Sequence, residues 1–169
     1  MSKSSPQGAL HYADYLKLAG LLAAQAPESA RHGRPAHDEM LFIIVHQTYE
    51  LWFKQILHEL DRIQVDFGGE VVEDEYLGRI VHGLERINEI LKLLIQQLEV
   101  LETMTPLDFL DFRDFLFSAS GFQSAQFRLI EIRLGLARGM RSQYAGKPFD
   151  DTLTAADRSR VAAAERGPS

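Results

Sequence analysis

The sequence predicts an all-α protein, a helical bundle organised around two long antiparallel helices. Residues 37–61 contain no glycine or proline, and apolar side chains recur there at steps of three and four residues, which is the period of a helix. Residues 70–102 show the same steps, as expected for the seam of a bundle. Gly68 and Gly69 separate the two stretches, so we expect the chain to turn back there. Because these helices lack enough partner surface within one chain, we also expect an oligomer.

The apolar positions of the two long helices predict which of their faces are buried. On the first helix, the positions expected to face the core are Leu41, Ile44, Val45, Trp52, Ile56, Leu60 and Ile63. On the second helix, the expected seam consists of Leu77, Ile80, Leu84, Ile87, Leu91, Leu94, Leu98 and Leu101.

The chain has 169 residues, a formal net charge of −6 and no cysteine. That length suits one domain or a piece of one. The negative charge argues against nucleic acid as a partner, and the lack of cysteine excludes disulfides and fits a reducing compartment. No apolar run approaches the roughly 20 residues of a membrane span, and the first residues lack the apolar core of a signal peptide. We therefore expect a cytoplasmic protein that binds neither membranes nor nucleic acid.

Composition divides the chain into three parts. Residues 1–9 contain serine, proline and glycine, and we expect them to be disordered. Residues 10–139 carry the helical patterns and form the predicted domain. Residues 140–169 are rich in arginine, aspartate, alanine, glycine and serine, so we expect a mostly disordered tail with one helical turn after Thr154.

Shorter helices are predicted on either side of the long pair. An amphipathic pattern predicts one over residues 10–25, followed by a loop. Residues 105–108 combine an N-cap threonine, a first-turn proline and a capping-box acid, so a second short helix is expected to start there. A last helix is predicted over residues 122–138, with Gly139 as its stop.

A second stripe on the first long helix has an unusual composition. It consists of Phe42, His46, Tyr49, Glu50 and Phe53, which lie three or four residues apart and so share a face. A solvated face would carry lysine, glutamate and arginine, whereas two phenylalanines, a tyrosine and one imidazole are typical of a pocket wall. His46 is then a candidate general base or hydrogen-bond donor. The alternative is a core histidine bonded to a backbone carbonyl.

Arg113 is set among four phenylalanines in the helix that follows residue 105. Phe109 lies one turn earlier on the same face. Such surroundings are unusual for a solvated arginine. The alternative to a binding role is that the stem of Arg113 covers apolar surface while Asp111 or Asp114 neutralises its charge.

Four runs of residues carry a resemblance to a known family. The first two are H-D-E-M-L-F-I-I at residues 37–44 and H-Q-T-Y-E-L-W at residues 46–52. The others are E-T-M-T-P-L-D-F-L-D-F-R-D-F-L at residues 102–116 and S-A-S-G-F-Q-S-A-Q-F-R-L-I-E at residues 118–131. Over about residues 10–138 this sequence resembles the N-terminal part of tryptophan 2,3-dioxygenase.

The resemblance implies a haem-dependent dioxygenase. Members of that family combine L-tryptophan with O2 to give N-formylkynurenine, the first step of tryptophan degradation by the kynurenine route. The resemblance also implies a cytoplasmic homotetramer in which the N-terminal segments of the subunits intertwine.

Individual roles follow from the same resemblance. His46 matches the catalytic residue that hydrogen-bonds the indole N–H, and Arg113 matches the residue that holds the substrate carboxylate. Phe42 clamps the indole, and Phe109 falls where the family has an aromatic wall. Further matches are Tyr12, Tyr15 and Leu16, which cover the indole of a neighbouring subunit, and Ser120 and Gly121, which line the haem site. One departure is Ser118, which stands where the family usually has proline and is expected to loosen that loop.

The proximal histidine that ligates haem iron in the family has no counterpart in this sequence. Apart from His46 the histidines are His11, His32, His37, His58 and His82, and none falls in a segment that resembles the proximal one. We therefore assign no metal ligand. Two functions stay open: a dioxygenase that is shortened or completed by another chain, and a haem-free relative that serves as a helical oligomerisation or ligand-binding module. A carboxylate-bridged di-metal bundle is excluded, because no glutamate has a histidine three residues later.

Overall fold

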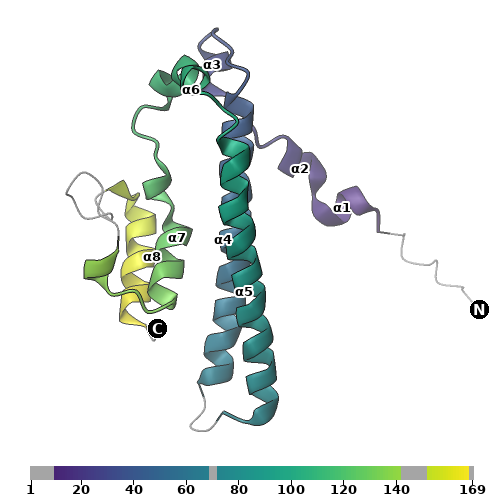
Figure 1. The fold of residues 1–169 in the computed structure, drawn as a ribbon, viewed down its shortest axis with the longest axis vertical. Helices are drawn as coiled ribbons and strands as arrows, with labels where there is room; N and C mark the ends of the chain where they lie inside the picture. The colour runs from purple at the N-terminus through teal and green to yellow at the C-terminus, as the bar shows by residue number, and fades with distance from the viewer. Residues whose placement is uncertain (1–9, 69–71, 142–151, 168–169) are drawn as a thin grey trace, which may run out of the picture.

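Two long antiparallel helices form the body of the protein. The computed structural model describes residues 10–68, 72–141 and 152–167, and this part of the chain contains helices and no β-strand. Helix α4 (Glu39–Phe67) and helix α5 (Asp74–Leu101) lie side by side along the length of the molecule (Figure 1). The predicted all-α class and the pair of long antiparallel helices are confirmed.

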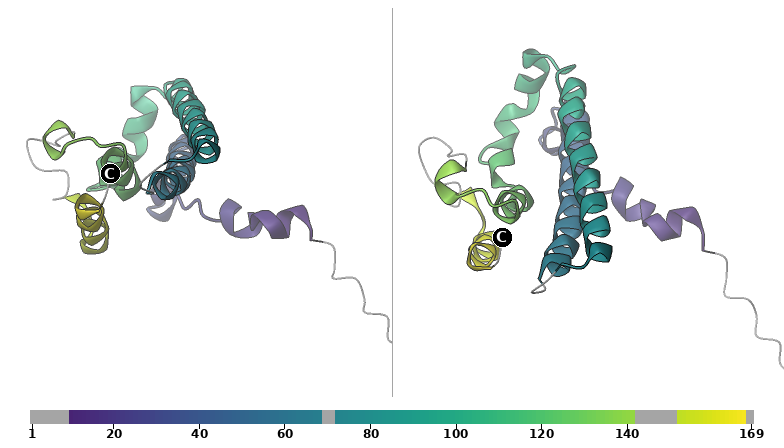
Figure 2. Two further views of the ribbon diagram at one scale, coloured as in Figure 1. Left: turned by 90° about the horizontal axis from the view of Figure 1, so that it is seen from below. Right: turned by 60° about the horizontal axis from the view of Figure 1, so that its bottom comes forward.

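Shorter helices surround this pair. In chain order they are α1 (Tyr12–Leu16), α2 (Leu18–Leu22), α3 (Glu28–Arg31), α6 (Pro106–Arg113), the 3-10 helices η1 (Asp114–Leu116) and η2 (Gly121–Gln123), α7 (Ala125–Arg133), the 3-10 helix η3 (Arg138–Met140) and α8 (Ala155–Arg166). Helices α3 and α6 meet at one end of the long pair, α7 and α8 pack against each other beside α4, and α1 and α2 extend away from the bundle (Figures 1 and 2). None of the helices in the described ranges combines the length and the apolarity needed to cross a membrane.

The main core lies between α4, α5 and α7. Its buried members are Ile56, Leu60, Ile63, Ile80, Ile87, Ile90, Leu94 and Ile130. The prediction that Val45, Ile56, Leu60 and Ile63 of α4 face the core is confirmed, because all four are buried. Ile44, which was predicted on the same face, is 46% exposed.

Gly83 determines how closely the two long helices approach each other. A Cβ atom at this position would lie 3.1 Å from Cδ1 of Ile63, which is too close for ordinary packing. The buried line of α5 therefore runs through Gly83 and Ile90, while the predicted seam residues Leu84 and Leu98 are 43% and 46% exposed. Three of the eight predicted seam residues, Leu77, Leu84 and Leu98, are therefore exposed. A pattern of apolar residues could not indicate this, because it does not include a glycine that permits close contact.

Several predicted boundaries differ from those in the structure. The helix predicted over residues 10–25 is broken at Lys17, whose φ of 54° is left-handed. The helix predicted over residues 122–138 begins as the separate turn η2 and ends at Arg133, because the chain turns at Gly135, which has a φ of 79°. The loop expected before α4 contains α3. The N-cap and capping box expected at the start of α6 are confirmed.

The described part of the tail is helical. Beyond the single turn predicted after Thr154, the structure has the 12-residue helix α8. The hydroxyl of Thr154 accepts the N–H of Asp157 at 3.1 Å, and Val161 and Leu153 pack against Ile132 of α7. The tail has few apolar residues, and such a composition predicts disorder. Packing against α7 nevertheless buries two of these residues, Leu153 and Val161. The other segments expected to be disordered, residues 1–9, 142–151 and 168–169, lie outside the described residues.

A buried carboxylate connects α4 to α5. Glu59 is 7% exposed, and Oε1 of Glu59 accepts hydrogen bonds from Nη1 of Arg86 and Nε2 of Gln55, both at 2.7 Å. Burial alone raises the pKa of Glu59, but the hydrogen bond and charge of Arg86, with the amide of Gln55, outweigh it. Together they hold the pKa of Glu59 below its ordinary value of 4.5.

We expect the folded chain to lose stability on acidification partly through Glu59. Because its pKa is lower in the folded state, its contribution is fully present above the pKa of the unfolded chain and is lost as the pH falls through the folded value. Urea unfolding between about pH 5 and pH 3 measures this loss. In Arg86→Met, burial should dominate the pKa of Glu59, so the loss of stability on acidification should be smaller than in the wild type. A pH profile of that variant parallel to the wild-type profile would show that Glu59 has no such role.

Candidate functional site

A pocket of about 870 Å3 lies where α6, η1 and η2 face the beginning of α4. Aromatic, cationic and small polar side chains line it together. The lining residues are Phe42, Phe109, Leu110, Arg113, Asp114, Leu116, Phe117, Ser118, Ala119, Ser120, Gln123 and Thr152. Four of the predicted site residues, Phe42, Phe109, Arg113 and Ser120, therefore meet in one hollow.

Phe42 and His46 lie one turn apart on α4 with their rings in contact. The ring centroids are 4.1 Å apart, and Nδ1 of His46 is 2.7 Å from the carbonyl oxygen of Phe42. Since a carbonyl only accepts, Nδ1 donates this hydrogen bond, and in the neutral ring Nε2 is an acceptor. The hydrogen bond from Nδ1 to a backbone carbonyl is the one expected of a core histidine. Among the described residues Nε2 has no hydrogen-bond partner, so it could still accept a hydrogen bond from a ligand. His46 is half-buried and is not among the lining residues; its ring lies in tilted contact with Phe42, which does line the pocket.

The lower part of the predicted stripe belongs to the core. The hydroxyl of Tyr49 donates to the carbonyl of Leu94 on α5, and burial raises the pKa of Tyr49. The ring of Phe53 packs against Phe127 of α7 at 5.4 Å. Of the stripe, only Phe42 lines this pocket.

Arg113 ends α6 and lines the pocket with an exposed side chain. Phe109, one turn earlier, forms part of the same wall, and its ring centroid is 5.7 Å from that of Phe42. Neither Asp111 nor Asp114 forms an ion pair with Arg113, and within the described residues its guanidinium has no hydrogen-bond partner. An unpaired guanidinium beside aromatic walls suits a carboxylate, which it can hold through two parallel hydrogen bonds.

Phe112 supports both aromatic walls from beneath. It is completely buried, and its ring centroid is 5.5 Å from that of Phe42 and 5.4 Å from that of Phe109, in edge-to-face arrangements. Through this ring, α4 and α6 are fixed relative to each other at the pocket.

Ser120 and Gly121 lie differently with respect to the pocket. Ser120 lines it as the N-cap of η2, whereas Gly121 is not among the lining residues. A Cβ atom at Gly121 would meet no atom within 4 Å, so the space beside it is open. Ser118, the departure from the family pattern, has a φ of 74°, which a proline ring cannot adopt.

Tyr12, Tyr15 and Leu16 are not part of the pocket within one chain. Their side chains are 74%, 70% and 39% exposed, and α1 and α2 contain no buried residue. Both short helices point away from the bundle in every view (Figures 1 and 2).

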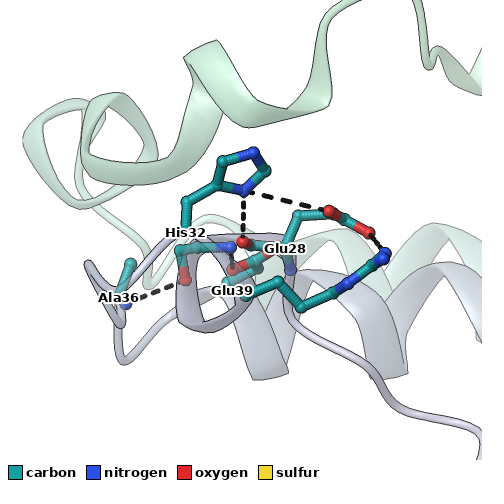
Figure 3. Close-up of polar contacts among 6 residues, drawn as sticks. Glu28, His32, Ala36 and Glu39 are labelled. Atoms are coloured by element: carbon teal, nitrogen blue, oxygen red, sulfur yellow. Dashed lines mark hydrogen bonds and ion pairs between the residues drawn. The ribbon is translucent and has the colours of Figure 1, made fainter.

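Glu39 holds α3 against the start of α4 near the pocket. Its carboxylate is 1% exposed and accepts the N–H groups of Glu28 at 2.8 Å and Ser29 at 3.0 Å. The hydroxyl of Ser29 in turn accepts the N–H of Ala36 at 3.0 Å (Figure 3). A buried carboxylate from α4 thus caps the four-residue helix α3.

Helix α3 also contacts η1, the segment that follows Arg113. The ring of His32 stacks on Phe115 of η1 with centroids 4.8 Å apart, and Nδ1 of His32 lies 2.8 Å from the carbonyl of Glu28. The first turn of α4 and the pocket segment η1 are therefore linked through α3.

We expect Glu39→Gln to destabilise the fold by about 1–3 kcal/mol, because an amide can accept only one of the two buried N–H groups and leaves the other unsatisfied. Urea unfolding of the variant measures this. Asp38→Asn is the matched control, since Asp38 makes no capping hydrogen bond at the same helix start, and it should change stability by less than about 0.5 kcal/mol. Equal losses in the two variants would contradict the role of Glu39.

Comparison with known proteins identifies the family. The family model described as Tryptophan 2,3-dioxygenase matches residues 2–169 of this chain. The chain belongs to the tryptophan 2,3-dioxygenase family. The match extends past the predicted limit at residue 138 and takes in α8.

Curated tryptophan 2,3-dioxygenases resemble most of this chain. The protein of Bdellovibrio bacteriovorus is 56% identical over 145 residues, covering 86% of this chain and 40% of the relative. The protein of Alteromonas mediterranea is 50% identical over 94% of this chain and 44% of its own length, and that of Rattus norvegicus is 49% identical over 87% and 36%. The chain therefore spans about two fifths of the length of the relatives it matches.

Tryptophan 2,3-dioxygenase implies haem, and the pocket fits part of that group. Its apolar walls suit the flat face of a porphyrin. An iron atom also needs an axial ligand such as histidine, cysteine, methionine or tyrosine, and none of these is among the lining residues. The lining residues offer apolar contact to the organic part of haem, but they supply no bond to its iron.

Gln123 is one of the lining residues that helical periodicity and the family resemblance do not indicate. Gln123 makes a capping box with Ser120, and its side chain accepts the backbone N–H of that residue at 3.0 Å. The spacing Ser-x-x-Gln is the sequence signature of such a box. The predicted helix begins at residue 122, after Ser120, so the prediction does not contain a cap formed by these two residues.

Proposed function

We propose that this chain forms the substrate-facing part of a haem-dependent tryptophan 2,3-dioxygenase, which combines L-tryptophan with O2 to give N-formylkynurenine. The observation that carries the proposal is the unpaired guanidinium of Arg113 in a pocket walled by Phe42 and Phe109. An amino acid with a large flat side chain matches such a site, because it presents a carboxylate and an aromatic ring together.

Each side chain has a distinct task in this proposal. Arg113 holds the substrate carboxylate through its guanidinium fork. Phe42 and Phe109 contact the indole ring and limit its orientation. His46 does not line the pocket, and its task is taken from the family resemblance: Nε2, left available by the bond of Nδ1 to the carbonyl of Phe42, would accept the N–H of an indole that reaches past Phe42.

Haem, when bound, supplies the binding and activation of dioxygen. We assign Ser120 and Gly121 to its edge, with the open space beside Gly121 as the support for this assignment. The residues of this chain position the substrate and exclude water from the indole.

We propose a homotetramer in the cytoplasm, in which α1 and α2 pack on a neighbouring subunit. Tyr12, Tyr15 and Leu16 are exposed on an element that buries nothing in its own chain, which supports an intermolecular role. In the assembly these three side chains would cover the indole of the neighbour.

A second candidate function is a haem-free oligomerisation or ligand-binding module. It is favoured by the lack of an axial iron ligand among the pocket residues. Titration with haemin under reducing conditions separates the two candidates, because bound haem gives a shifted and sharpened Soret band.

The proposed function predicts haem binding, a tetrameric elution volume in size-exclusion chromatography and formation of N-formylkynurenine from L-tryptophan and O2. Haem binding without turnover would limit the chain to binding the substrate and cofactor. Absence of a Soret change would exclude a dioxygenase formed by this chain alone and would favour the haem-free module.

A further inference from the structure

Both ends of the Gln123 side chain bind backbone groups of the pocket wall. Nε2 of Gln123 donates to the carbonyl of Ser118 at 2.8 Å, and Oε1 accepts the N–H of Ser120 at 3.0 Å. The backbone N–H of Gln123 also donates to the carbonyl of Ser120 at 2.9 Å. One side chain thus closes the loop 118–123, and four residues of this loop line the pocket.

Burial alone does not hold this loop. Ser118 and Ala119 are exposed, and the preceding Phe117 is 93% exposed. Ser118 has a φ of 74°, a conformation that costs energy for a residue with a Cβ atom. Besides the bond from the N–H of Ala119 to the carbonyl of Leu116, the amide of Gln123 provides the restraint that maintains this conformation.

We propose that Gln123 is a positioning residue of the pocket, which holds residues 118–121 in the shape that accepts L-tryptophan. The inference rests on the proposed function for the identity of the ligand. Only an amide both donates to Ser118 and accepts from Ser120; glutamate accepts only, and methionine of similar length does neither.

Hydrogen exchange at single amides tests the first half of the proposal on the full chain. In Gln123→Met the N–H of Ser120 should exchange about tenfold faster than in the wild type, because its acceptor is lost. In Gln123→Glu the Ser120 N–H should keep its protection, since a carboxylate still accepts it. Gln126→Met is the matched control: it removes two hydrogen bonds to Glu50 from outside the pocket and should leave Ser120 unchanged.

Titration of the full chain with L-tryptophan, with and without added haemin, tests the second half. We expect Gln123→Met to bind about tenfold more weakly than the wild type, as for the loss of two hydrogen bonds, and Gln126→Met to bind within about twofold. Wild-type affinity in Gln123→Met, with or without faster exchange at Ser120, would overturn the role of Gln123 while leaving the proposed function intact. Failure of the wild-type chain to bind tryptophan would overturn the proposed function and this role with it.

Discussion

Replacing Arg113 by methionine is expected to weaken L-tryptophan binding by about 2–4 kcal/mol, or roughly 30- to 900-fold. Arg113 has no ion-pair partner among the described residues, so its removal should weaken ligand binding with little change in the free energy of unfolding. Isothermal titration of the chain, with and without added haemin, measures the affinity, and urea unfolding measures the stability.

Two comparisons make this prediction specific. Arg113→Lys keeps the positive charge but loses the planar fork, so it should fall between the wild type and Arg113→Met. Tryptamine has the indole ring without the carboxylate, and its affinity should be nearly the same in the wild type and Arg113→Met. Equal losses for tryptophan and tryptamine would show that Arg113 acts on the shape of the pocket and does not contact the carboxylate.

Phe112→Ala is expected to destabilise the fold by about 3–5 kcal/mol, because it empties a fully buried site in the contact between α4 and α6. The variant also removes the ring that supports Phe42 and Phe109, so tryptophan affinity should fall with stability. Urea unfolding and ligand titration of the same preparations measure both effects.

Phe117→Ala is the control for Phe112. It makes the same chemical change five residues later, at a side chain that is 93% exposed. Its effect on stability should be within about 0.5 kcal/mol. A loss in Phe117→Ala comparable to that in Phe112→Ala would mean that the described burial of the two rings is wrong.

The regular parts of this fold could be predicted from local pattern. Helices α4 and α5 are long, periodic and free of proline, and residues 105–108 have the capping residues that α6 uses. The register of the α5 seam could not be predicted, because it depends on the contact of Gly83 with Ile63 of another helix. The same holds for α8, whose few apolar residues become buried only through α7.

The candidate site could be predicted in part. Phe42, Phe109, Arg113 and Ser120 were proposed from sequence and share a pocket, although their roles stay predictions. Phe42 lines the pocket and His46, one turn away, does not; this difference depends on side-chain packing that no spacing rule contains.

Two contributions to the site could not be anticipated from helical periodicity. The cap that Glu39 provides for α3 lies across a loop, and the amide of Gln123 bridges two backbone groups within another loop. Both are hydrogen bonds between side chains and irregular backbone, where local sequence patterns are weakest.

Binding of the L-tryptophan carboxylate by Arg113 is tested most directly by side-chain NMR of the arginines in the full chain. We expect L-tryptophan to shift the Nε–H resonance of Arg113 and to slow its exchange with water, whereas tryptamine should leave it unchanged. An Arg113 resonance that does not respond to saturating L-tryptophan would show that the pocket does not bind the amino acid in this way.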